Sequence, residues 1–214
     1  KWKKNNLGKG WVLGETLITG IGQGYIQSTP LQLCMMTAQI ANGGYSIKPK
    51  IIVDSNPISY EDAKQSMESQ LVFDLNSKIL GDKKLFNEKK NIKIIQEAMF
   101  SSTNERFGTS YSSRIDDPKY QFAGKTGTAQ VKRISKRERE LDLELEQIPY
   151  KDRDHALYVA YGPYINPRYA LSVIIEHGGS GSKAAAPIAK KLFKLIIDRH
   201  SLREKQSNFE RINI

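Results

Sequence analysis

Three strand-like runs in the second half of the chain predict a β-sheet. They span residues 121–131 (QFAGKTGTAQV), 155–163 (HALYVAYGP) and 169–176 (YALSVIIE), and β-branched and aromatic residues in short runs are typical of strands. The turn over residues 162–167 is short enough to join the last two runs as an antiparallel pair. We therefore expect an antiparallel sheet.

The first half predicts a short strand and a well-delimited helix. Residues 16–19 (TLIT) are β-branched and apolar, as in a short strand. The Ser-Thr-Pro sequence at 28–30 offers an N-cap followed by proline in the first turn, so we expect a helix over 31–42. The Asn-Gly-Gly sequence at 42–44 ends it. Residues 54–90 are polar without clear periodicity, and we expect loops with one short helix at most.

Two further helices follow from periodic apolar positions. One is expected over 91–102, where the inner face consists of Ile92, Ile95 and Met99. The other is an amphipathic helix over 184–200 (AAAPIAKKLFKLIIDRH). Its expected inner face consists of Ile188, Leu192, Leu195 and Ile196. Residues 201–214 are polar, and we expect them to fray.

A long charged excursion, residues 131–154, separates the first two strands. Leu141, Leu143 and Leu145 alternate with acids, as in a strand. Leu141, Leu145 and Ile148 also fit a helix, and both interpretations stay open. The excursion is either a solvated loop or a flap or docking surface beside the strand that precedes it.

Composition and charge exclude several classes of protein. The 214 residues are 39% hydrophobic and 26% charged, as in an ordinary globular protein. The net charge of +10 is spread along the chain without aromatic–basic interleaving, so a solvated basic surface is favoured over nucleic-acid binding. With Cys34 as the one cysteine, the chain forms no internal disulfide or zinc cluster, and we expect Cys34 to be a small core residue. No apolar run approaches the roughly 18 residues that span a bilayer. Because the chain starts without Met, we expect it to be a piece of a longer protein.

The first predicted strand carries chemistry that suits an anion. Lys125 supplies a positive charge, and Thr126 and Thr128 supply hydroxyls. Gly124 and Gly127 lack a Cβ, so another chain can approach the backbone closely there.

Two nucleotide-binding motifs are rejected for the glycine-rich stretches. A phosphate loop ending in Gly-Lys-Thr would need its leading glycine at Lys119. A dinucleotide fingerprint beginning at residue 20 would need its third glycine at Tyr25, and the following helix also starts too late.

The K-T-G element of serine acyl-transferases that handle D-alanyl peptides and β-lactams fits instead, and the match extends along the chain. Residues 20–51 (GIGQGYIQSTPLQLCMMTAQIANGGYSIKPKI) resemble the G-Q-G…T-P-L-Q…A-N-G-G segment of class B penicillin-binding proteins. QFAGKTGTAQV resembles their K-[ST]-G-T-A strand, and HALYVAYGPYINPRYALSVIIEHGG and AAAPIAKKLF resemble the hairpin and closing helix that follow. Within the family, GIGQGY and the long insert before His155 are most similar to the penicillin-binding protein 2 branch, the rod-elongation transpeptidases.

This resemblance implies the fold. It would be an α+β fold, an antiparallel sheet flanked by helices, of the penicillin-binding and β-lactamase-like transpeptidase type. Residues 1–200 would form the C-terminal portion of a transpeptidase domain, and residues 201–214 a polar tail. The fold would be incomplete, because the nucleophile-bearing helix would lie outside this chain.

The resemblance also implies a role for each residue of the K-T-G strand. Lys125 would provide positive potential for the terminal carboxylate of the substrate or β-lactam, and the hydroxyls of Thr126 and Thr128 would bond it. Gly127 would let the substrate lie alongside as an added strand. The backbone N–H of Thr128 would be one of two oxyanion-hole donors. No cofactor or metal is implied.

The family's S-x-x-K and S-x-N motifs would lie upstream of this chain, so the fragment itself would be inactive. The S-x-x-K match at 180–183 follows K-T-G in a glycine loop, and the S-x-N match at 102–104 follows a helix. We interpret both as chance matches. His155, His177 and His200 have no nucleophile-elbow context, and we expect the first two to be structural or to line the cleft.

For the parent protein, the resemblance implies a serine D,D-transpeptidase that cross-links peptidoglycan stem peptides and is acylated by β-lactams. It would be anchored in the inner membrane, face the periplasm, and depend on a glycosyltransferase and a scaffold protein of the elongation complex. A serine β-lactamase-related hydrolase and a non-catalytic peptidoglycan- or partner-binding module are the alternatives.

Overall fold

The centre of the molecule is a three-stranded antiparallel sheet. The computed structural model describes residues 1–49, 80–86, 88–132 and 143–212. The sheet consists, in spatial order, of β3 (Ala123–Ala129), β4 (His155–Gly162) and β5 (Tyr169–Ile175). All three strands lie within the runs that the sequence predicted, and the antiparallel pairing of the last two is confirmed.

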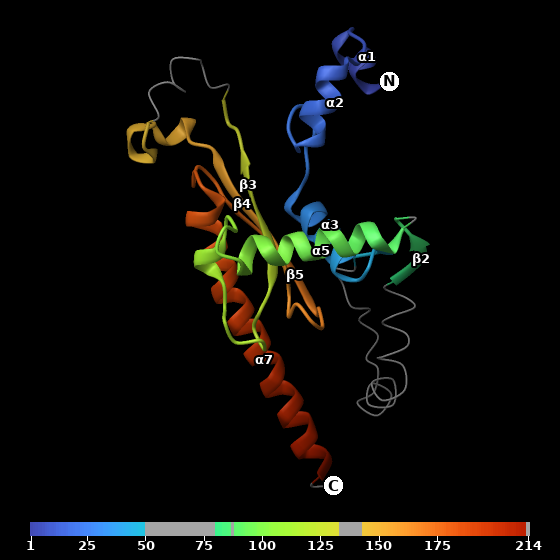
Figure 1. Ribbon diagram of the computed structural model, residues 1–214, viewed down its shortest axis with the longest axis vertical. Helices are drawn as coiled ribbons and strands as arrows, with labels where there is room; N and C mark the ends of the chain where they lie inside the picture. The colour runs from blue at the N-terminus through green and yellow to red at the C-terminus, as the bar shows by residue number, and fades with distance from the viewer. Residues whose placement is uncertain (50–79, 87, 133–142, 213–214) are drawn as a thin grey trace, which may run out of the picture.

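Helices cover both faces of this sheet, as Figure 1 shows. One face packs against the long helix α7 (Ala186–Ile212), and the other against α3 (Pro30–Ala41) and α5 (Lys89–Asn104). A separate antiparallel pair consists of β1 (Tyr45–Ile47) and β2 (Leu80–Lys84). The expected α+β fold, an antiparallel sheet flanked by helices, is confirmed.

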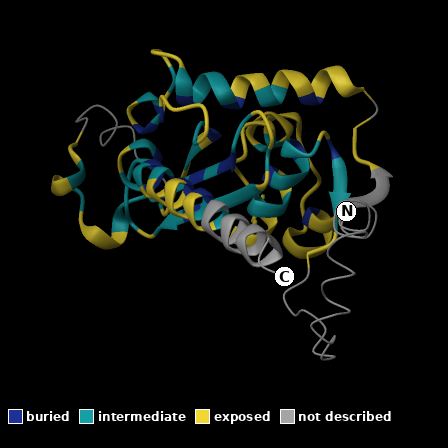
Figure 2. Cartoon of the chain, turned by 90° about the horizontal axis from the view of Figure 1, so that it is seen from below, coloured by how far each residue is buried: buried dark blue, intermediate teal, exposed yellow. Residues whose placement is uncertain are grey.

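Burial concentrates in the sheet and on the helix faces turned toward it (Figure 2). On the α7 side, Phe122 stacks on Phe193 with ring centroids 4.9 Å apart, and Tyr158 is fully buried beside them. On the other side, Met99 of α5 and Ile40 of α3 pack against the sheet. As expected, the inner face of α5 contains Ile92 and Met99 buried and Ile95 half-buried.

The inner face of α7 differs from the sequence prediction. The buried residues are Ala186, Ala189, Phe193 and Ile197. The residues expected there are exposed, namely Ile188, Leu192 and Leu195, or half-buried, namely Ile196. The helix carries two apolar stripes. The stripe that contains alanines faces the sheet, because small side chains let the helix approach closely enough for Phe193 to stack on Phe122.

Helix α3 begins and ends where its sequence signals place it. Thr29 Oγ1 accepts a hydrogen bond from the Gln32 N–H at 3.2 Å, and Gln32 Oε1 accepts one from the Thr29 N–H at 2.8 Å. This reciprocal capping satisfies two donors at the helix start. The helix stops at Ala41, after which Gly43 and Gly44 have φ of 86° and 92°. Cys34 is half-buried on this helix, and its Sγ donates to the Ala170 carbonyl of β5 at 3.4 Å.

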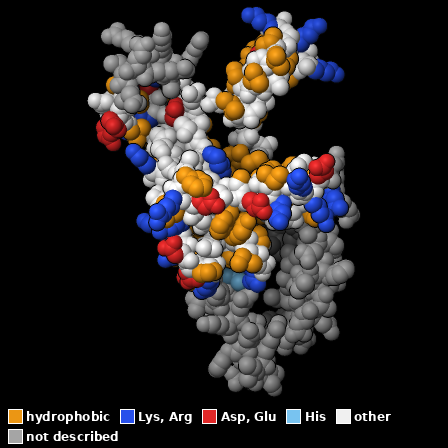
Figure 3. Space-filling view, viewed as in Figure 1, with side chains coloured by type: hydrophobic (Ala, Val, Ile, Leu, Met, Phe, Trp, Pro, Cys, Tyr) orange, Lys and Arg blue, Asp and Glu red, His pale blue; other side chains and the backbone are white. Residues whose placement is uncertain are grey.

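The strand predicted at 16–19 is wrong, because these residues belong to helix α2 (Leu13–Gly20). Glu15 Oε2 accepts from the Val12 N–H at 2.9 Å, and the indole N–H of Trp11 donates to Thr16 Oγ1 at 2.8 Å. These local bonds stabilise the first turn and outweigh the β-branched composition. Helices α1 (Trp2–Leu7) and α2 project away from the sheet and carry many exposed apolar side chains (Figure 3).

Three other segments of the chain also differ from the sequence prediction. Residues 80–84 form strand β2 where loops were expected, and residues 54–79 lie outside the described part of the chain. In the excursion, residues 143–154 form two 3₁₀ turns, Leu145–Gln147 and Tyr150–Asp152, in place of a strand or α-helix. Leu141 lies outside the described residues. Helix α7 continues to Ile212, so residues 201–212 are helical where fraying was expected.

Within the described ranges, no helix is both long and apolar enough to cross a membrane.

Candidate functional site

The Lys-Thr-Gly sequence lies in the middle of β3, which is an edge strand of the described sheet. An edge strand leaves backbone N–H and C=O groups unpaired along one side. Lys125 and Thr128 are exposed, and Thr126 and Gly127 are half-buried. Lys125 Nζ donates to the Thr126 carbonyl at 2.8 Å and lies 3.4 Å from Thr126 Oγ1. A cation and two hydroxyls thus lie along a strand that can still accept a partner.

The space available for a side chain differs between the two glycines of this strand, Gly124 and Gly127. A Cβ on Gly124 would lie 2.3 Å from the Tyr158 hydroxyl oxygen, so only glycine fits there without displacing Tyr158. A Cβ on Gly127 would meet only Leu157 Cβ, at an ordinary 3.4 Å. Packing within the chain therefore requires a glycine at Gly124. It leaves room for a Cβ at Gly127, so packing within the chain gives no reason for glycine at that position.

Beneath Gly124, three buried hydroxyls bond to one another. The Tyr158 hydroxyl lies 2.9 Å from Thr103 Oγ1 and 3.1 Å from Ser110 Oγ. Burial raises the pKa of the Tyr158 phenol, which these hydrogen bonds oppose only in part. Because each hydroxyl has a partner, this cluster fixes the end of α5 and the loop after it against β4.

A second, exposed set of hydroxyls reaches the motif itself. Thr109 Oγ1 lies 3.1 Å from Thr126 Oγ1 and 3.3 Å from Ser102 Oγ. Thr109 was not expected at the site, because nothing in a single sequence marks a threonine 17 positions before Thr126 as its neighbour. Folding alone brings them together.

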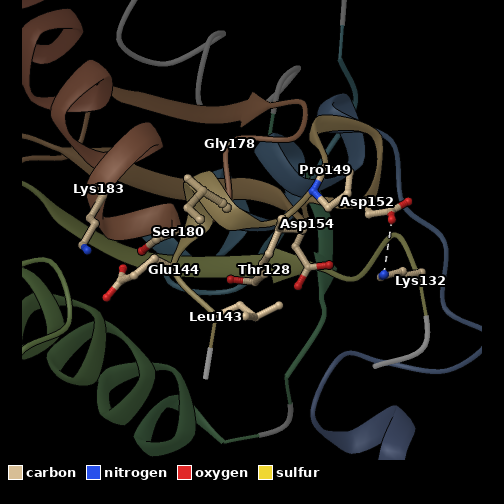
Figure 4. Close-up of a pocket in the computed structure, with 13 residues that line it drawn as sticks. Thr128, Lys132, Leu143, Glu144, Pro149, Asp152, Asp154, Gly178, Ser180 and Lys183 are labelled. Atoms are coloured by element: carbon tan, nitrogen blue, oxygen red, sulfur yellow. Dashed lines mark hydrogen bonds and ion pairs between the residues drawn. The ribbon is translucent and has the colours of Figure 1, made fainter. Parts of the chain in front are cut away.

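Beyond Thr128, β3 leads into a pocket of about 600 Å³ (Figure 4). The excursion forms one wall with Leu143, Leu145 and Asp152. Another wall is formed by Gly179 in the loop after β5 and by Lys183 in the π-helical turn that follows, Gly181–Ala185. Lys132 and Asp152 form an ion pair at 3.3 Å on the rim. The described part of the excursion thus lies beside the K-T-G strand, where the interpretation as a flap or docking surface requires it.

Structural partners also occupy the S-x-x-K match at 180–183 and the S-x-N match at 102–104. Ser180 Oγ, at the start of the π-helical turn that contains Lys183, bonds to Ser182 Oγ within that turn at 2.9 Å. Asn104 Nδ2 donates to the carbonyls of Phe100 and Phe122, both at 3.0 Å, and so ties α5 to the start of β3.

The histidines also take part in the framework. The His177 N–H donates to His155 Nδ1 at 2.9 Å, and His177 Nδ1 donates to the Arg153 carbonyl at 2.9 Å. These bonds fix the start of β4 against the end of β5, which agrees with the expected structural role of His155 and His177. His200 contacts Arg168 on the α7 side. In the described ranges, no group of three or more His, Cys, Asp or Glu side chains is arranged to hold a metal ion.

An antiparallel sheet flanked by helices, with Lys-Thr-Gly on its edge strand, defines the class of penicillin-recognising serine acyl-transferases. The family model for the penicillin-binding protein transpeptidase domain matches residues 3–194, and the chain belongs to this family.

Relatives and solved structures agree on the branch of the family. The chain is 30% identical over 201 residues to the peptidoglycan D,D-transpeptidase MrdA of Salmonella typhimurium, covering 92% of this chain and 29% of that protein. It is similar to penicillin-binding protein 2 of Helicobacter pylori in complex with MreC, with 29% identity, a TM-score of 0.68, and coverage of 92% and 30%. For Pseudomonas aeruginosa PBP2 in complex with WCK 5153, the identity is 34%, the TM-score 0.61, and the coverage 88% and 34%. The chain is therefore part of a PBP2-like transpeptidase domain and spans less than a third of the length of its curated relatives.

Proposed function

We propose that the protein containing this chain cross-links peptidoglycan stem peptides through a serine acyl-enzyme, and that it binds β-lactams at the same site. The observation that carries this proposal is the exposed edge of β3, where Lys125, Thr126 and Thr128 surround a position that lacks side-chain bulk at Gly127. A D-alanyl peptide offers a terminal carboxylate and an extended backbone, which match the cation and the unpaired strand edge.

Each residue has a defined task in this mechanism. Lys125 and the hydroxyls of Thr126 and Thr128 bind the carboxylate, and charge assistance makes the lysine contribution the largest. Gly127 leaves space for the peptide to lie along β3 as an added strand. The backbone N–H of Thr128 donates to the oxyanion that forms on the attacked carbonyl.

The nucleophile comes, in this proposal, from outside residues 1–214. The hydroxyl of Ser180 is bonded to Ser182, and the Ser102–Asn104 match ends with an amide whose two bonds go to backbone carbonyls. We therefore expect the isolated chain to form no covalent adduct with a fluorescent penicillin on a denaturing gel. A saturable covalent band would contradict this and direct attention to Ser180.

The proposal extends to location and partners. The MrdA relatives are peptidoglycan D,D-transpeptidases by name, and the H. pylori PBP2 was solved with MreC. By analogy, the parent protein is anchored in the inner membrane with this domain in the periplasm, and it works with a scaffold protein and a glycosyltransferase of the elongation complex.

The deciding experiment supplies the full-length protein with a stem pentapeptide donor and an amine acceptor, and follows products by mass spectrometry. A cross-linked product with loss of D-alanine supports a transpeptidase. Repeated turnover of nitrocefin without cross-linking would indicate a β-lactamase-like hydrolase. Stem-peptide binding without either reaction would indicate a non-catalytic module.

A further inference from the structure

Thr126 is the end of a chain of three hydroxyls that begins on another element. Ser102 Oγ, in the last turn of α5, lies 3.3 Å from Thr109 Oγ1, which lies 3.1 Å from Thr126 Oγ1. These three hydroxyls therefore connect the end of α5 with the K-T-G strand.

Either oxygen of each pair could be the donor in this chain of hydroxyls, and a bound carboxylate, which only accepts, selects one direction of donation. An ammonium group only donates, so at 3.4 Å Lys125 Nζ uses one acceptor position of Thr126 Oγ1. A hydroxyl oxygen offers two acceptor positions and one proton. When Thr109 donates into the second position, the proton of Thr126 is left to point at an incoming anion. Thr109 in turn accepts from Ser102, and bonds aligned in this way strengthen one another.

The position of Thr109 is fixed by its two neighbours, although Thr109 itself is exposed. The N–H and the hydroxyl of Ser110 both donate to the Ser102 carbonyl at 3.0 Å. A Cβ on Gly108 would lie 2.3 Å from the same carbonyl oxygen, so the Gly108 backbone packs directly on the end of α5. Thr109 is thus held between two anchored residues and needs no ligand to reach Thr126.

We propose that Thr109 is a positioning residue of the transpeptidase site. It holds the Thr126 hydroxyl as a donor to the terminal carboxylate of the D-alanyl peptide or β-lactam. The inference rests on the proposed function, since the carboxylate is that of its substrate. It adds a distinct expectation: because Thr109 acts through Thr126, its contribution appears only with ligands that carry the carboxylate.

The test measures second-order acylation rates of the full-length protein with a penicillin and with the methyl ester of the same penicillin. Thr109→Val removes the hydroxyl at similar size and should slow acylation by the free acid about fivefold, the effect of one neutral hydrogen bond. Thr109→Ser keeps the hydroxyl and should stay within about twofold of the parent. With the ester, Thr109→Val should change the rate less than about twofold. Ser112→Ala, which removes an exposed hydroxyl from the 3₁₀ turn that follows Thr109 (Tyr111–Ser113), is the matched control and should leave both rates unchanged.

The outcomes separate this inference from the proposed function. If the parent is not acylated by the penicillin at all, both are overturned. If the parent is acylated and Thr109→Val reacts with the acid at the parental rate, the inference alone is overturned. Equal slowing with acid and ester would also overturn it, because a general distortion of the strand affects both ligands. Thr109→Val should add little in a Thr126→Val background, and independent, additive losses would contradict action through Thr126.

Discussion

Gly124 and Gly127 occupy the same short strand, yet alanine should reduce stability at the first position and the rate of acylation at the second. In Gly124→Ala, the new Cβ would lie 2.3 Å from the Tyr158 hydroxyl oxygen and 2.5 Å from the adjacent ring carbon, so Tyr158 must move. Overpacking of this kind costs about 1–3 kcal/mol. Displacing the hydroxyl also breaks its bonds to Thr103 and Ser110, and a buried hydroxyl left without a partner costs about 1–3 kcal/mol more.

Against these costs, alanine reduces the entropy of the unfolded chain and so stabilises by about 0.4–1 kcal/mol. The net expectation for Gly124→Ala is a loss of about 1–5.6 kcal/mol in the free energy of unfolding. At Gly127 the new Cβ makes only an ordinary contact at 3.4 Å, and the φ is not in the left-handed region. Gly127→Ala should therefore change stability by less than about 1 kcal/mol. It should instead slow acylation, because its methyl group occupies the space that the ligand uses.

The assay is urea unfolding of the full-length protein, comparing the midpoints of the two variants with that of the parent, together with the rate of acylation by a fluorescent penicillin. Gly124→Ala at a parental midpoint would refute the packing argument for the first glycine. Gly127→Ala with a parental acylation rate would refute the assignment of the second to the ligand.

Three further predictions follow from individual contacts. Thr126→Ser should acylate at nearly the parental rate because the hydroxyl is kept, whereas Thr126→Val should be about fivefold slower, as measured with a fluorescent penicillin. Phe193→Ala should cost about 3–5 kcal/mol by urea unfolding, because Phe193 is fully buried against Phe122, while Leu195→Ala, at a position 67% exposed, should cost less than about 1 kcal/mol. Burial raises the pKa of Tyr158, so the phenol loses its proton at lower pH in the unfolded state than in the folded state. The melting temperature should therefore decline as the pH rises above about 10, and Tyr158→Phe should flatten that decline.

The sequence correctly predicted the elements that have clear local signals, such as a helix cap or a strand-like run. Helix α3 is delimited by Thr29 and Gly43, and strands β3 to β5 lie within the strand-like runs of the sequence, so these elements were correctly expected. The sequence of helix α7 by itself does not determine which face turns inward. Its apolar residues form two stripes, and only the sheet decides that the alanine-containing stripe with Phe193 faces inward. The strand predicted over residues 16–19 was wrong for a related reason. The hydrogen bond that the Glu15 side chain accepts at the start of helix α2 outweighs the strand propensity of the β-branched residues.

The site divides in the same way. The residues of the K-T-G strand could be named from the sequence because their types and order are distinctive. Thr109 and Ser102 could not, since a hydroxyl carries no signal of its neighbours until α5 and β3 are packed together. The same holds for Tyr158, whose hydroxyl explains Gly124 only in three dimensions.

The central claim is that Lys125 binds the carboxylate of a D-alanyl peptide or β-lactam. The most direct test is the second-order rate of acylation of the full-length protein by a fluorescent penicillin, for the parent and for Lys125→Ala. A charge-assisted hydrogen bond contributes about 1.5–3 kcal/mol, which corresponds to a rate about 10- to 100-fold lower in the variant at an unchanged melting temperature. A variant that is acylated at the parental rate would show that Lys125 is an ordinary surface lysine and would contradict the assignment of the site.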